Sequence, residues 1–145
     1  MSIVKERERR KILHVFLSYA KADEEYANKV ENILENYNLR IFTMKMLNAG
    51  EDWLNNLRDE ISQSDLFIVI LSPNSFKSEW VLSELGAAWA LEKIIIPIYT
   101  KPEMLSKSPI NLSNSESIDI NYLEEHPEVL DRIIEKYKES IMKNP

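Results

Sequence analysis

Residues 78–90 contain the side chains best suited to chemistry. The segment reads SEWVLSELGAAWA, so the carboxylate of Glu84 follows Trp80 by four positions. On a helix, residues four apart share one face, so the acid and the indole can border the same cleft. A carboxylate is rarely buried without a partner. Periodicity therefore leaves two interpretations open: Glu84 is an ordinary solvent-facing residue, or it lines a pocket where its charge has a function.

The remaining residues of this segment have structural interpretations. Four small residues favour close packing of the helix on a sheet, namely Gly86, Ala87, Ala88 and Ala90. Trp89 is most simply a core residue. We assign no function to any of them.

Several other chemistries lack the residues that they require. Gly50 and Gly86 are the only glycines, which excludes a Rossmann fingerprint and a phosphate-binding P-loop. Without cysteine, the chain has no disulfides, thiolate metal sites or cysteine nucleophile. His14 and His126 fall in no triad or metal-ligand spacing. We interpret both histidines as structural and expect no metal site.

Charge and hydropathy argue against two classes of protein, those that bind nucleic acid and those that span a membrane. The 145 residues include 18 Lys and Arg against 24 Asp and Glu, a net charge of −6. An acidic domain without a basic stripe is a poor candidate for nucleic-acid binding. Residues 1–11 form a charged lead-in, and the apolar runs are far shorter than the roughly 20 residues that span a bilayer. We expect a soluble, cytoplasmic protein without membrane contact, folded as one domain over residues 12–145.

Patterns typical of strands and of helices alternate along the chain, and the elements that they predict must position Glu84. Runs rich in β-formers predict strands over 12–17, 39–44, 66–71 and 94–99, and more weakly over 117–122. Apolar residues three and four apart predict helices over 26–37, 54–64, 79–92 and 129–141. Asp23 and Ser78 are suitable N-caps for the first and third helices. Residues 45–52 and 101–116 are predicted loops.

This order of elements predicts the fold class. Strands alternating with helices imply right-handed βαβ units and a parallel sheet covered on both faces. Five strands predict a flavodoxin-like three-layer α/β sandwich. Ligands of such sheets bind beyond the carboxyl ends of the strands, near the point where strand order reverses. The segments at that edge are 18–23, 45–53 and 72–84, and the last of them ends at Glu84.

Four short motifs follow one another through the first hundred residues. They are VFLSY (15–19) with Asp23 after it, LNAGEDW (47–53), LSPNS (71–75), and SEW (78–80) leading into W-x-x-x-E (80–84). Each motif alone occurs often by chance. In this order they resemble the Toll/interleukin-receptor (TIR) domain family, and W-x-x-x-E resembles its bacterial and plant-like members that cleave NAD+.

The sequence also departs from the family pattern. Thr43 and Met44 stand where many members have an aspartate near the end of the second strand. The Arg-Asp-x-Pro-Gly loop and the late Phe-Trp box of animal members are missing. These departures weaken an interpretation as an animal-type adaptor, and beyond Lys101 the resemblance transfers no residue.

The resemblance implies an NAD+ nucleosidase with Glu84 as the catalytic carboxylate. The nicotinamide of NAD+ is already a pyridinium, so it leaves as a neutral molecule without protonation. An oxocarbenium-like charge then develops on the ribose, and a carboxylate beside it stabilises that charge. The products would be nicotinamide and ADP-ribose or a cyclic isomer of ADP-ribose. NAD+ is the substrate, and no cofactor is implied.

The family also implies a set of substrate-binding residues, which are Ser18, Tyr19, Lys21, Asn48, Gly50, Trp53, Ser78 and Trp80. The first three would line the edge at the first strand. Trp80 would shape the side of the pocket that holds the ribose and nicotinamide. Trp53 either stacks on a base or is a core aromatic, and both interpretations stay open.

Partners follow from the same resemblance. We expect self-association through TIR–TIR contacts. We also expect a nucleotide product that signals to a separate effector protein, or recruitment by another protein, as in bacterial anti-phage systems. Two other classes are open: a non-catalytic TIR interaction module, and an N-glycosidase that acts on nucleosides. Incubation with NAD+ and with nucleosides distinguishes the three.

Overall fold

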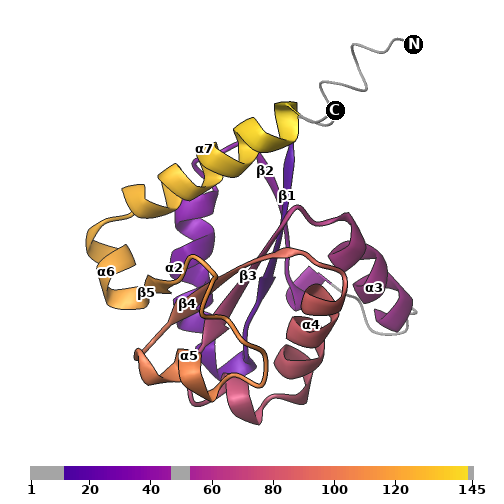
Figure 1. The fold of residues 1–145 in the computed structure, drawn as a ribbon, viewed down its shortest axis with the longest axis vertical. Helices are drawn as coiled ribbons and strands as arrows, with labels where there is room; N and C mark the ends of the chain where they lie inside the picture. The colour runs from indigo at the N-terminus through magenta and orange to yellow at the C-terminus, as the bar shows by residue number, and fades with distance from the viewer. Residues whose placement is uncertain (1–11, 47–52, 144–145) are drawn as a thin grey trace.

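Five parallel strands form the centre of the protein in a computed structural model that describes residues 12–46 and 53–143 (Figure 1). The strands are β1 (Leu13–Ser18), β2 (Leu39–Phe42), β3 (Leu66–Leu71), β4 (Ile94–Tyr99) and β5 (Ile118–Asp119). Their order in the sheet is β2-β1-β3-β4-β5. This order confirms the predicted flavodoxin-like α/β architecture, with strand order reversing between β1 and β3.

Helices cover both faces of the sheet. The α-helices are α2 (Glu24–Leu34), α3 (Trp53–Gln63), α4 (Glu79–Ala90), α5 (Glu103–Lys107), α6 (Ile120–Glu125) and α7 (Glu128–Lys143). Short 3-10 helices are η1 (Lys21–Asp23), η2 (Met44–Met46) and η3 (Ser75–Lys77). Helices α2, α6 and α7 pack on one face, and α3 and α4 pack on the other (Figure 1). Within the described residues, no helix is long and apolar enough to cross a membrane.

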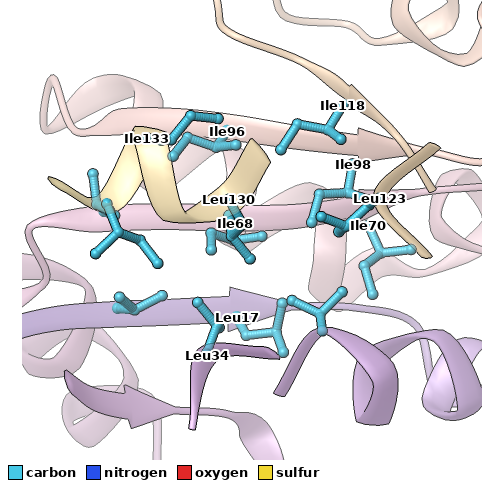
Figure 2. Close-up of a cluster of buried hydrophobic side chains, with 14 of the residues drawn as sticks. Leu17, Leu34, Ile68, Ile70, Ile96, Ile98, Ile118, Leu123, Leu130 and Ile133 are labelled. Atoms are coloured by element: carbon cyan, nitrogen blue, oxygen red, sulfur yellow. The ribbon is translucent and has the colours of Figure 1, made fainter. Parts of the chain in front are cut away.

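Side-chain alternation along the strands divides the core into two clusters. In β3, Ile68 and Ile70 face α2, α6 and α7, whereas Phe67 and Val69 face α3 and α4. Figure 2 shows the first cluster, in which Leu34 of α2 and residues of α6 and α7 meet side chains of four strands. All six residues of β3 are buried, as expected for a strand covered on both faces.

Pro97 lies inside β4 without interrupting it. It pairs in register with Val69 of β3. On its other side β4 pairs with β5 only at Ile98 and Tyr99, so Pro97 lies on a free edge there. A proline is tolerated at such a position because no ladder bond requires its missing N–H. The predicted strand is confirmed.

Several predicted elements differ from the structure, among them the helix predicted over 26–37, which ends at Leu34. The second strand ends at Phe42, and 3-10 helix η2 follows it. The predicted loop over 101–116 contains α5, whose Met104 is buried against the core. The predicted strand over 117–122 is restricted to two residues, because the Asp119 side chain accepts hydrogen bonds from the backbone N–H of Asn121 and Tyr122 and starts helix α6 there.

Two expectations for the last turn of α4 are also wrong: where the helix ends and where Trp89 lies. Glu92 has a φ of 56°, and Lys93 N–H bonds to Ala88 O, a left-handed turn that ends the helix earlier than predicted. Trp89 is 61% exposed, so its assignment to the core was wrong. It follows Ala88 by about 100° around the helix, outside the arc that faces the sheet.

The four small residues of α4 also differ from one another. Ala88 is buried against the sheet as predicted, but Ala90 is exposed and Ala87 is half-buried. A Cβ added to Gly86 would meet no atom within 4 Å. Close packing on the sheet therefore explains Ala88 and does not explain Gly86 or Ala90.

Candidate functional site

Ser18 lies at the carboxyl end of β1 and faces α4. It follows Phe16 by two residues, so strand alternation directs both side chains to the same face of the sheet. The hydroxyl is fully buried and donates a hydrogen bond to Glu84 Oε1 across 3.1 Å. Packing of α4 on the sheet thus brings together two residues that are 66 positions apart in the sequence.

Helix α4 presents Glu84 to the sheet. The helix starts as predicted at Ser78, whose Oγ accepts a hydrogen bond from Val81 N–H at 3.2 Å. Glu84 comes three residues after Val81 and four before Ala88, and these two side chains are buried against the sheet. Glu84 is only 1% exposed. The interpretation of Glu84 as a solvent-facing residue is therefore wrong.

The carboxyl group of Glu84 is only partly satisfied. Its Oε1 accepts the bond from Ser18, whereas its Oε2 has no hydrogen-bond partner within the part of the chain that the structure describes. Burial raises the pKa of Glu84 from 4.5 to about 7, and the hydrogen bond from Ser18 lowers it in part. Near neutral pH the group can therefore exist as an acid or as a carboxylate. Strongly shifted acids in clefts are typical of functional sites.

A cavity of about 350 Å³ opens beside this carboxyl group. It is lined by Leu17, Tyr19, Lys21, Glu24, Met44, Lys45, Ser78, Trp80 and Glu84. This volume lies within the roughly 300 to 1,000 Å³ of small-molecule sites. Trp80 is 41% exposed, so its ring belongs to the cavity wall and not to the core.

The structure brings together most of the predicted site residues that it describes. Tyr19, Lys21, Ser78 and Trp80 line the cavity together with Glu84. Ser18 is not a lining residue but donates a hydrogen bond to Glu84. Two further predictions, Asn48 and Gly50, lie outside the described residues. Trp53 begins α3, but its side chain is likewise outside the description, so its two interpretations stay open.

Four residues of the lining were not among the predicted site residues: Leu17, Glu24, Met44 and Lys45, of which only Lys45 belongs to a segment, 45–53, that was predicted at the ligand edge. Lys45 had a usable signal, because it directly follows a predicted strand whose carboxyl end belongs to the ligand edge. Glu24 had none, because the first turn of a helix is commonly acidic whatever its function.

Asp23 connects two loops that border the cavity. It occupies the predicted N-cap position of α2, but its side chain makes no capping bond. Instead Oδ2 accepts a bond of 2.5 Å from Ser72 Oγ, and Oδ1 accepts one of 2.9 Å from Asn74 Nδ2. Asp23 is buried. It therefore ties the loop after β1 to the loop after β3.

No metal centre is evident in the part of the chain that the structure describes. No group of three or more His, Asp or Glu side chains there is arranged to hold an ion. His14 lies in β1, and its backbone N–H donates to Asp65 Oδ2 at 2.8 Å. His126 contacts Glu128 at 3.2 Å on the surface. Neither histidine lines the cavity.

Comparison with known sequences defines the class of protein. The family described as "TIR domain" matches residues 15–134, which is most of the chain. The chain therefore belongs to the TIR domain family. No curated protein matches the sequence significantly.

Solved structures agree with this assignment. The TIR domain of the Toll-related receptor TRR-2 from Hydra magnipapillata is 25% identical, with a TM-score of 0.68 over 86% of this chain and 97% of that one. The TIR domains of the activated Roq1 resistosome are 22% identical, with a TM-score of 0.56 over 90% and 82% of the two chains. The CMP N-glycosidase BcmB of Clostridium botulinum shares the fold at 19% identity, with a TM-score of 0.55 over 80% and 98%.

Proposed function

We propose that this TIR domain cleaves the bond between nicotinamide and ribose in NAD+, with Glu84 as the catalytic carboxylate. One observation carries the proposal: a buried carboxyl group with one unpartnered oxygen lies at the wall of a ligand-sized cavity. A buried charge is costly unless a partner compensates it. A cationic centre that forms on a bound substrate would be such a partner.

The chemistry follows from the leaving group. When the C1′–N bond breaks, its electron pair returns to the pyridinium nitrogen, and nicotinamide leaves as a neutral molecule. The positive charge stays on the ribose, where the ionised Glu84 stabilises it. Ser18 holds Oε1, which leaves Oε2 for the ribosyl cation or a ribose hydroxyl.

Two nucleophiles can then complete the reaction. Water attacks C1′ and loses a proton to give ADP-ribose, or the adenine of the same molecule attacks and gives a cyclic isomer. Trp80 borders the cavity and would contact the ribose and nicotinamide. Ser78, Tyr19 and Lys21 would complete the substrate contacts among the described residues.

Assembly and biological role belong to the same proposal. The Roq1 TIR domains were observed in an activated resistosome, which supports self-association of this fold. We place this protein in the cytoplasm, where NAD+ is available, and in bacterial anti-phage signalling through its nucleotide product. An effector protein that recognises this product would be its partner.

A second candidate is hydrolysis of a nucleoside or nucleotide with a neutral base. The fold of the CMP N-glycosidase supports it. A neutral base needs a proton as it leaves, and an acid with a pKa of about 7 can donate one. The two candidates therefore require opposite protonation states of Glu84.

One experiment separates the candidates. The purified protein at high concentration is incubated with NAD+ and, separately, with CMP and cytidine, and released nicotinamide or free base is measured by chromatography. Nicotinamide release that the Glu84→Gln variant abolishes supports NAD+ cleavage. Release of cytosine supports the second candidate, and release of neither supports a non-catalytic interaction module.

A further inference from the structure

A second charged group lines the cavity away from Glu84 and Ser18. Lys45 of η2 projects towards α2, where its Nζ lies 3.3 Å from Asn28 Oδ1 and 3.3 Å from Glu31 Oε1. The same Nζ lies 5.9 Å from the centre of the Tyr19 ring. Lys45 Nζ thus contacts residues of α2, whereas the carboxyl group of Glu84 is bonded to Ser18 of β1. The cavity therefore has two separate polar regions.

Lys45 is oriented by its neighbours but still accessible. Glu24 lies 3.9 Å from its Nζ, a third contact at the long end of the range for ion pairs. The lysine side chain is 43% exposed. Burial lowers the pKa of Lys45, but its contacts with Glu31 and Tyr19 outweigh burial and raise it. The ammonium group is therefore positive at neutral pH and open to a ligand in the cavity.

A second lysine reinforces this region. Lys21 lines the same cavity and is exposed. Two ammonium groups that line one cavity suit a phosphate-bearing ligand, because each supplies several donors and a full positive charge. Glu24 and Glu31 hold Lys45 in place and also oppose an added negative charge. A moderate contribution from Lys45 is therefore expected.

We propose that Lys45, together with Lys21 of the same cavity lining, forms a subsite for the diphosphate of the substrate and makes the cavity select nucleotides over nucleosides. This inference rests on the proposed function, because it assumes that a nucleotide occupies the cavity. Glu84 would act at the ribose bond, and Lys45 would determine which molecules are held there.

Ligand binding tests the subsite without any need for catalysis. Isothermal titration with ADP-ribose and with adenosine compares wild type, Lys45→Met, Lys45→Arg and Lys29→Met. The last variant is the matched control, since Lys29 pairs with Glu124 of α6 and does not line the cavity. Loss of a charge-assisted contact should weaken ADP-ribose binding by about 10-fold in Lys45→Met. Lys45→Arg and Lys29→Met should stay near wild type, and adenosine binding should be equal in all four.

Several results would overturn the inference. Lys45→Met could bind ADP-ribose as tightly as Lys29→Met, or could lose adenosine and ADP-ribose binding equally. Failure of the wild type to bind ADP-ribose would also reject it. The melting temperature of each variant shows whether a loss of affinity reflects unfolding instead. If Lys45→Met is unfolded, the charge-preserving Lys45→Arg decides. An ADP-ribose affinity near that of the wild type supports the subsite, and a tenfold loss rejects it.

The same variants separate this inference from the proposed function. Nicotinamide release by the wild type decides the function alone. If NAD+ is cleaved, Lys45→Met should lower kcat/KM for NAD+ by about 10-fold and leave nicotinamide riboside unaffected. Equal losses for both substrates would reject the subsite while the NAD+-cleaving activity stands. If NAD+ is not cleaved, the ADP-ribose titration still decides whether Lys45 binds the diphosphate.

Discussion

The hydroxyl of Ser18 donates a hydrogen bond to one oxygen of Glu84, and the other oxygen is buried without a partner among the described residues. This arrangement fixes the direction of a buried acid without neutralising it. Burial raises the pKa of Glu84 to about 7, so small changes around the carboxyl group alter its charge near neutral pH. The first three predictions follow from this relationship.

Glu84→Gln should lower turnover strongly, because it keeps the shape of the side chain and removes its charge. Loss of a preorganised electrostatic contact should reduce kcat for nicotinamide release by at least roughly 10² to 10³-fold, with a much smaller change in KM. Glu79→Gln, an exposed change on the same helix, is the control. Wild-type turnover in Glu84→Gln would end the enzymatic proposal for this residue.

The pH dependence of stability should differ between wild type and Glu84→Gln. Between pH 4.5 and about 7, the folded protein keeps a proton on Glu84 that the unfolded chain releases. The contribution of Glu84 to the free energy of unfolding of the wild type therefore falls as pH rises through this window and is level above it. Glutamine does not titrate, so the glutamine variant lacks this contribution. The free energy of unfolding of Glu84→Gln should therefore rise relative to that of the wild type by about 3 kcal/mol across the window. Urea unfolding at pH 5 and pH 8 measures it, and an equal difference at both values would contradict the burial of Glu84.

Ser18→Ala should shift the pH profile of NAD+ cleavage. The ionised Glu84 is the active form, so kcat/KM should rise with pH through a midpoint near 7 in the wild type. Removing the bond that lowers the pKa of Glu84 should move this midpoint upward and restore part of the activity at alkaline pH. Ser64→Ala, another buried serine away from the cavity, is the control. An unchanged midpoint in Ser18→Ala would show that Ser18 has a structural role only.

Trp80→Ala should impair turnover more than folding. The ring is 41% exposed on the cavity wall, so its removal leaves no closed void in the core. Truncation of a buried tryptophan would instead cost about 3 to 5 kcal/mol. Trp89→Ala on the same helix should affect neither turnover nor folding, since that residue is 61% exposed and is not among those that line this cavity. A collapse of the melting temperature in Trp80→Ala would refute the placement.

Self-association should control activity. We expect the loop that contains Gly50 to complete the substrate site against a neighbouring subunit, although this loop lies outside the described residues. Specific activity should then rise with protein concentration, and Gly50→Leu should lower it while the monomer stays folded. Gly86→Ala is the control, because an added Cβ there meets nothing within 4 Å. Specific activity that stays flat over a wide concentration range would count against assembly.

Much of the fold follows from local patterns in the sequence. The buried run Leu66–Leu71 predicts the central strand because no position alternates to polar, and Ser78 predicts the start of α4 because its hydroxyl can cap the helix. Where local signals were weak, they failed. The region over 117–122 alternates like a strand, but Asp119 caps helix α6, so residues 120–122 are helical.

The sequence by itself determined the order of strands and helices and the spacing of Trp80 and Glu84, because these depend on neighbours within one or two turns. Only the tertiary structure decided that Glu84 is buried, that Ser18 is its partner and that Lys45 shares its cavity. Those relationships join the end of β1, η2 and helix α4, which are distant in the chain, and the order in which the parallel strands pack brings them together. The pKa of Glu84 depends on this burial, so the chemical character of the site is a property of the folded protein.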